Sequence, residues 1–230
     1  MITLDAFGTL VELERPAPRL AAQLRARGVR ASEQQAAAAL RAEMTYYLEH
    51  HDSATDEDAL ALLRDRCAEG LAGGLRAAGV QLGGLAEGEL RAALLAALRF
   101  RAYDDVPGAL AELRAAGHRL VVVSNWDVSL HEMLRTTGLD RLVDAAISSA
   151  EAGERKPAPG IFRRALALAG AAPDEGRALH VGDSLEADVA GALGAGLRAV
   201  LVARAGSWPA EVPAGVPVVR SLGELPALAA

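Results

Sequence analysis

The N-terminal stretch Met1-Ile2-Thr3-Leu4-Asp5-Ala6-Phe7-Gly8-Thr9-Leu10 decides how the rest of the chain is interpreted. Residues 2–4 are apolar or β-branched and predict a short buried strand. Asp5 follows at once, and Gly8 then marks a sharp turn of the backbone. In a parallel sheet, ligands bind in the loops just beyond the carboxyl ends of the strands. The stretch therefore places the Asp5 carboxylate where chemistry can occur.

The composition limits the kinds of partner. The chain has 230 residues, of which 51% are hydrophobic, so it can bury a core and is not disordered. Its 24 Lys and Arg against 30 Asp and Glu give a net charge of −6, which argues against a nucleic-acid partner. We find neither a long apolar run nor a secretion signal, and the single cysteine, Cys67, fits a reducing compartment. We expect a cytoplasmic protein with a small-molecule substrate and no membrane partner; the sequence leaves the oligomeric state open.

The pattern of apolar residues divides the chain. Up to about Phe100 it is helical, with helices expected over 19–27, 32–50, 55–70 and 90–100, glycine-rich turns over 73–84, and no visible strand. After Tyr103, strands are expected over 119–123, 145–148, 178–182, 199–203 and 216–219, with helices over 107–117, 159–170 and 190–196 between them. This alternation predicts a parallel sheet with right-handed crossovers, which the first strand also joins. We expect a core domain of residues 1–12 and 101–230 and a helical domain of residues 13–100.

Polar side chains follow several of these strands. Ser124 and Asn125 come directly after one strand and offer hydrogen bonds to the oxygen atoms of an anion. Their ordinary alternative is a turn or a helix cap. Lys156, the only lysine in the chain, lies next to a predicted helix N-terminus and suits an anion site; its ordinary alternative is a solvated charge.

Two acids, Asp183 and Asp188, lie just past the predicted strand 178–182. If they cluster with Asp5, the carboxylates repel one another unless a hard cation lies between them, and an oxygen-rich site suits Mg²⁺. The ordinary alternative is a strand, loop and helix in which Asp188 is exposed.

Taken together and in this order, these segments resemble the motifs of the haloacid dehalogenase-like hydrolase superfamily. The matching motifs are Asp5-Ala6-Phe7-Gly8-Thr9-Leu10, Ser124-Asn125, Lys156-Pro157, and Gly182-Asp183 with Asp188. The resemblance implies an α/β fold with a three-layer Rossmann-like core, a parallel sheet of order 3-2-1-4-5, and an all-helical cap inserted between the first and second motifs. Such a cap closes over the site, and its polar or aromatic candidates are Arg41, Glu43, Tyr46, Tyr47, His50 and His51.

The resemblance also implies a mechanism. Asp5 is the expected nucleophile of a covalent aspartyl intermediate, which water then hydrolyses. The expected ligands of Mg²⁺ are Asp5, the backbone carbonyl of Phe7, Asp183 and Asp188. The phosphoryl oxygens are expected to contact Ser124, Asn125 and Lys156, and Lys156 offsets charge in the transition state.

Phe7 departs from the phosphatase pattern. Phosphatases of this family usually have a second Asp at this position as general acid and base, and phenylalanine cannot transfer a proton. The 2-haloacid dehalogenases of the family, which work without metal, also have an aromatic residue there, because a halide leaves without a proton. Asp183 and Asp188 favour a Mg²⁺-dependent phosphatase over a dehalogenase. A hydrolase-like scaffold that binds phosphate with little turnover is a third interpretation, although the retained Asp5 argues against it.

Overall fold

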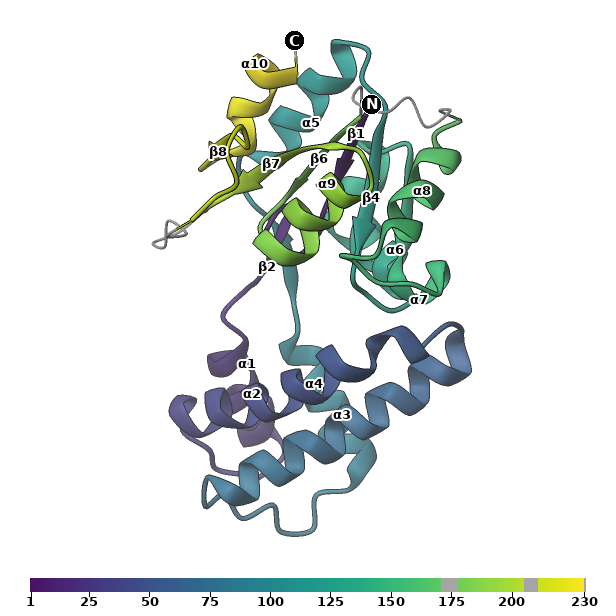
Figure 1. Ribbon diagram of the computed structural model, residues 1–230. Coiled ribbons are helices and arrows are strands. Elements are labelled where there is room, and N and C mark those ends of the chain that lie inside the picture. Colours follow the sequence, from purple (N-terminus) through teal and green to yellow (C-terminus); the bar gives the residue numbers. More distant parts are fainter. Residues whose placement is uncertain (171–177, 205–210, 230) are drawn as a thin grey trace. The chain divides into compact units, whose positions relative to one another are not determined.

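Short apolar and β-branched segments form a parallel sheet of six strands in the order β5-β4-β1-β6-β7-β8 (Figure 1). The computed structural model describes residues 1–170, 178–204 and 211–229. The strands are β1 (Ile2–Leu4), β4 (Leu120–Ser124), β5 (Ala145–Ser148), β6 (Leu179–Gly182), β7 (Arg198–Val202) and β8 (Val218–Val219). Counted along the chain within this sheet, the order is 3-2-1-4-5 with a sixth strand at the edge, which confirms the predicted α/β fold and strand order.

The central position of β1 explains its sequence. Both of its neighbours, β4 and β6, run parallel to it, and all three of its residues are buried. A strand in the middle of a parallel sheet is covered on both faces, so its residues are mostly apolar or β-branched and do not alternate with exposed polar ones. Asp5 leaves this strand at its carboxyl end, at the point where the connections to the two neighbouring strands diverge.

Helices cover both faces of the sheet (Figure 1). Thr3, Val121 and His180 occupy one register level of β1, β4 and β6, so their side chains point to the same face. That face packs against Phe162 of α8 in a buried apolar cluster. The helical segments of this unit are α5 (Val106–Ala115), α6 (Leu130–Thr137), η2 (Leu139–Arg141), α7 (Ser149–Ala152), α8 (Pro159–Leu168), η3 (Leu185–Ala190), α9 (Gly191–Gly194), η4 (Leu222–Glu224) and α10 (Leu225–Ala229).

The chain divides into two compact units, residues 1–12 with 101–230 and residues 13–100. We call the second the helical unit. Its helical segments are α1 (Pro16–Ala26), α2 (Glu33–His50), η1 (His51–Ser53), α3 (Glu57–Ala77) and α4 (Glu87–Ala97). The capping box at Ser32 starts α2 as the sequence predicts, since the Ser32 hydroxyl accepts from the backbone N–H of Gln35.

Three expectations for residues 13–100 and their borders were wrong. Helix α1 begins at Pro16 and not near Arg19, because proline is well suited to the first turn of a helix. Helix α3 runs through Gly73 and Gly74, the first two of the glycines expected to form turns, whereas Gly79 and Gly83 lie in turns as predicted. A Cβ on Gly74 would lie 2.7 Å from the Cα of Ala39, so this glycine lets α3 approach α2 closely. Finally, β2 (Val11–Leu13) and β3 (Phe100–Ala102) form a small two-stranded sheet that the sequence pattern did not reveal.

Helix length and apolar content bear on membranes. Within residues 1–170, 178–204 and 211–229, no helix is both long enough and apolar enough to cross a bilayer.

Candidate active site

Asp5 meets the second and third motifs at the carboxyl edge of the sheet. The hydroxyl of Ser124, the last residue of β4, donates to Asp5 Oδ1 at 3.0 Å. The ammonium of Lys156 donates to the same oxygen at 2.7 Å. Asp5 and Lys156 are 6% and 3% exposed, so this ion pair is shielded from water. The predicted nucleophile therefore contacts the only lysine of the chain directly.

Lys156 also contacts the fourth motif. Its Nζ donates to Asp188 Oδ1 at 2.5 Å, so one ammonium bridges two buried carboxylates. Burial alone would lower the pKa of Lys156, but Asp5 and Asp188 outweigh it and raise that pKa above its usual value. Burial raises the pKa of Asp5 although Lys156 opposes the effect. Lys156 is therefore a permanent cation at the centre of the site.

Asn125 binds the backbone of Lys156. Its amide Nδ2 donates to the carbonyl of Lys156 at 2.9 Å, and its Oδ1 accepts from the backbone N–H of Lys156 at 2.8 Å. Both polar atoms of this side chain are thus engaged by the backbone of Lys156. Asn125 joins the loop after β4 to the segment before α8 and holds the lysine in place, and its contact with a phosphoryl group stays a prediction.

Asp188 is held from three sides. Its Oδ1 accepts from Lys156 and from His180 Nε2 at 3.0 Å, and its Oδ2 accepts from the backbone N–H of Ser184 at 2.9 Å. Burial alone would raise the pKa of Asp188, but Lys156 and His180 outweigh it and hold that pKa well below its usual range. A Cβ on Gly182 would lie 2.2 Å from Asp188 Cγ, so a glycine is required there for the carboxylate to reach this position.

Asp183 is the most open of the acids. Loss of solvation near the surrounding protein atoms is the largest cause that raises the pKa of its carboxyl, to about 7. The negative charges of Asp5 and Asp188 act in the same direction. Its place depends on Gly8: a Cβ there would lie 2.0 Å from Asp183 Oδ2, and the φ angle of Gly8 is +82°. The glycine in the first motif therefore serves both the turn and the approach of the fourth motif.

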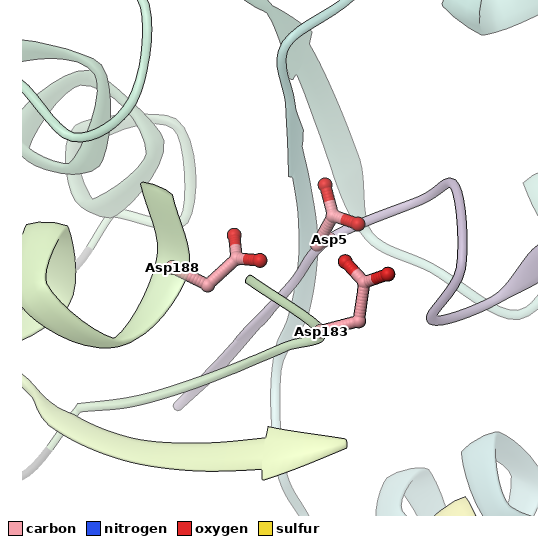
Figure 2. Close-up of side chains that lie close together, drawn as sticks. All are labelled: Asp5, Asp183 and Asp188. Carbon is pink, nitrogen blue, oxygen red and sulfur yellow. The ribbon is translucent and has the colours of Figure 1, made fainter. Parts of the chain in front are cut away.

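Asp5, Asp183 and Asp188 form a candidate metal site (Figure 2). One oxygen from each carboxylate lies within 4.8 Å of the others. Opposite oxygens around Mg²⁺ are about 4 Å apart, so small side-chain rotations would suffice to bind the ion. One ammonium does not balance the charge of these carboxylates, and oxygen atoms are the ligands that Mg²⁺ prefers. The residues present therefore fit this cation.

Neither Phe7 nor Asp127 is placed to donate a proton to a leaving group: Phe7 has no acidic proton, and Asp127 is held in a turn. Phe7 lies two residues after Asp5 in the turn, and its side chain is 44% exposed. Its carbonyl as a metal ligand stays a prediction. Asp127 is buried, and its Oδ1 accepts from the backbone N–H of Ser129 at 2.7 Å, so it stabilises the turn before α6.

The candidates in the helical unit separate by burial. Glu43 and His51 are 3% and 2% exposed and lie inside the unit, so they do not offer a surface to a substrate. The ring of Tyr46 stacks on that of His50, with the ring centroids 4.0 Å apart. A role of Tyr46 and His50 in specificity stays a prediction.

Thr3 and His180 are buried polar residues that the motifs of the sequence do not include. The two side chains lie opposite each other on β1 and β6, and the Thr3 hydroxyl is 2.9 Å from His180 Nδ1. Burial lowers the pKa of His180, although Asp188 opposes this, so the ring is neutral near pH 7. The available signal was a polar residue at the same level of two otherwise apolar strands.

Comparison with known proteins gives one family. The family model described as haloacid dehalogenase-like hydrolase matches residues 1–196. Among curated relatives, the N-acylneuraminate-9-phosphatase of Mus musculus is 38% identical over 128 residues, covering 54% of this chain and 50% of that protein. The phosphoserine phosphatase of Thermus thermophilus is 40% identical over 107 residues, covering 46% and 42%. The chain thus spans about half or less of the length of the curated relatives that it matches.

A solved structure extends the likeness to the whole fold. The L-2-haloacid dehalogenase from Xanthobacter autotrophicus matches with a TM-score of 0.68 at 24% identity, over 99% of this chain and 96% of that chain. At this identity the likeness concerns the fold alone, since one fold can host unrelated chemistries.

Proposed function

Because this chain belongs to the haloacid dehalogenase-like hydrolases, we propose that it is a Mg²⁺-dependent phosphatase that acts on a small phosphorylated metabolite through a covalent aspartyl intermediate. The observation that supports this most is the contact of Lys156 with Asp5 and Asp188 beside a third carboxylate, Asp183. Phosphate esters are dianionic, so a carboxylate can attack one only where cations offset the repulsion. The two relatives named phosphatases agree with this substrate class.

The protein residues act in two steps. An Asp5 oxygen attacks phosphorus, a bond from Asp5 to phosphorus forms, and the leaving oxygen departs with the bonding electron pair. Water then attacks phosphorus, the bond to Asp5 breaks, and inorganic phosphate and the Asp5 carboxylate are released. Ser124 and Lys156, which donate to Asp5 in the structure, bind the phosphoryl oxygens during both steps.

The acids supply the cation site. Asp5, Asp183, Asp188 and the Phe7 carbonyl would hold Mg²⁺. When bound, Mg²⁺ neutralises charge on the phosphoryl oxygens.

Phe7 limits the substrate. It cannot protonate a leaving group, and general acid catalysis contributes about 10²–10⁴-fold to rates. The favoured substrates are therefore phosphates whose leaving group departs unprotonated, such as acyl and aryl phosphates. A cytoplasmic location and a small-molecule partner complete the proposal, on the composition and the single cysteine.

Steady-state hydrolysis with and without Mg²⁺ tests the proposal. The panel contains acetyl phosphate, aryl phosphates of graded leaving-group pKa, alkyl phosphates and 2-chloropropionate. We expect Mg²⁺-dependent hydrolysis that rises steeply as the leaving-group pKa falls and is lost in Asp5→Asn. Asp140→Asn, the same change at an exposed acid of η2, is the matched control.

Phe7 also favours a second candidate, a 2-haloacid dehalogenase, because a halide leaves without a proton. Metal-independent halide release from 2-chloropropionate would establish that activity in place of the phosphatase. If neither reaction occurs while phosphate analogues still bind, the chain is a phosphate-binding scaffold.

A further inference from the structure

The polar pair Thr3 and His180 lies inside the layer between the sheet and α8. Both residues are fully buried, on neighbouring strands at one register level. The ring of Phe162 meets the His180 ring edge-on, with the centroids 5.0 Å apart. Placing a threonine and a histidine in an apolar layer costs free energy unless their polar atoms are hydrogen-bonded. The hydrogen-bond partners of the two side chains therefore indicate their role.

Each polar atom of the pair has a defined partner. Asp188 accepts hydrogen bonds with both oxygens, so His180 Nε2 donates to Asp188 Oδ1. The other ring nitrogen, Nδ1, pairs with the Thr3 hydroxyl at 2.9 Å. With both nitrogens hydrogen-bonded and the ring packed against Phe162, the imidazole has one orientation.

The same Asp188 oxygen accepts from Lys156, whose ammonium reaches Asp5 Oδ1. The contacts therefore form one continuous chain from the sheet interior to the nucleophile. If His180 no longer held Asp188, that carboxylate could rotate about its side-chain bonds, and the ammonium would lose its fixed place between the two acids.

We propose that His180, oriented by Thr3, is a positioning residue that fixes the Asp188 carboxylate and thereby places the Lys156 ammonium against Asp5. Its effect on turnover rests on the proposed hydrolase function. Its effect on Lys156 does not, so the two can be tested separately.

Substitutions that differ only in the hydrogen bond test this chain of contacts. His180→Leu fills the same space beside Phe162 with an apolar side chain and removes the hydrogen bond to Asp188. His180→Gln restores an N–H donor about as far from the backbone as Nε2. Thr3→Val removes the hydroxyl without changing the shape, and Thr3→Ser restores it. Thr9→Val is the matched control, because the Thr9 hydroxyl is also fully buried but has no hydrogen-bond partner among the described residues.

The first readout needs no substrate. Since Lys156 is the only lysine, a lysine-labelled, tag-free chain gives one side-chain ammonium signal in NMR. We expect a slowly exchanging Nζ–H signal in the wild type, Thr3→Ser and Thr9→Val, and loss or broadening of it in His180→Leu and Thr3→Val. His180→Gln should recover it.

The second readout is kinetic. With acetyl phosphate and Mg²⁺ we expect His180→Leu to lower kcat about 10–100-fold with little change in KM, the usual effect of losing a residue that orients a site carboxylate. Thr3→Val should lose less, and His180→Gln and Thr3→Ser should recover most of the rate.

An unchanged Lys156 signal in His180→Leu would overturn the proposal, as would a loss of kcat that follows the melting temperature and is not recovered by glutamine. If the wild type hydrolyses no phosphate, the proposed function fails, and the ammonium signal still decides the role of His180.

Discussion

Glu43 of α2 makes the stability of the helical unit depend on pH. The residue is 3% exposed, its Oε2 has no hydrogen-bond partner among the described residues, and its carboxyl group interacts with Cys67 of α3. Burial, only partly opposed by a hydrogen bond with Cys67, raises the pKa of Glu43 from 4.5 to about 7.

The direction in which stability changes with pH follows from the number of protons bound in the folded and unfolded states. Between pH 4.5 and about 7 the folded unit retains the Glu43 proton that the unfolded chain has released. The contribution of Glu43 to stability is therefore most favourable below pH 4.5, becomes less favourable as pH rises through this window, and is constant above it. A rise from 4.5 to about 7 corresponds to at most about 3.5 kcal/mol at ~1.4 kcal/mol per pKa unit.

We predict that Glu43→Gln removes this dependence, because the amide has nearly the same shape and stays neutral. The variant should match the wild type near pH 4.5 and be more stable by about 1–3 kcal/mol at pH 8. The measurement is urea unfolding at a series of pH values, with amide hydrogen exchange in α2 and α3 to assign the change to the helical unit.

Two controls sharpen the result. Glu49→Gln makes the same change at an exposed position of α2 and should leave the pH profile unaltered. Asp183, in the other unit, has a raised pKa too and gives a dependence of the same sign, so only the difference between variant and wild type is interpreted. Equal pH profiles for the wild type and Glu43→Gln would refute the reasoning.

Three further predictions concern the site. Lys156→Met leaves two buried carboxylates without their cation, so we expect loss of turnover and about 3–5 kcal/mol of destabilisation in urea, part of which added Mg²⁺ restores; unchanged unfolding would contradict the buried bridge. Gly8→Ala places a Cβ against Asp183, so Mg²⁺ binding measured by calorimetry should weaken at least tenfold, a prediction that wild-type affinity would contradict. Phe7→Asp supplies a proton donor and should raise the rate on alkyl phosphates by about 10²-fold or more; an unchanged rate would show that the site does not accommodate an acid there.

The order of the motifs and the fold class followed from sequence because they depend on local patterns. A buried apolar strand followed by an acid, as at Asp5, needs only the residues themselves to be recognised. The strand at 145–148 and the cap at Ser32 are of the same kind, and the structure confirms both. Lys156 stood out because it is the only lysine, whatever its surroundings.

Tertiary structure alone decided which groups meet. Asn125 had a suitable side chain for an anion, but the neighbouring segment brings the Lys156 backbone to both of its polar atoms. Gly74 was predicted to lie in a turn, but it lies inside α3, where the absence of a side chain lets the backbone of α2 approach closely. Thr3 and His180 are far apart in the chain, and their pairing depends on the register between β1 and β6. Local propensity acts over a few residues, whereas such contacts are set by strand register and backbone approach, which the sequence pattern does not specify.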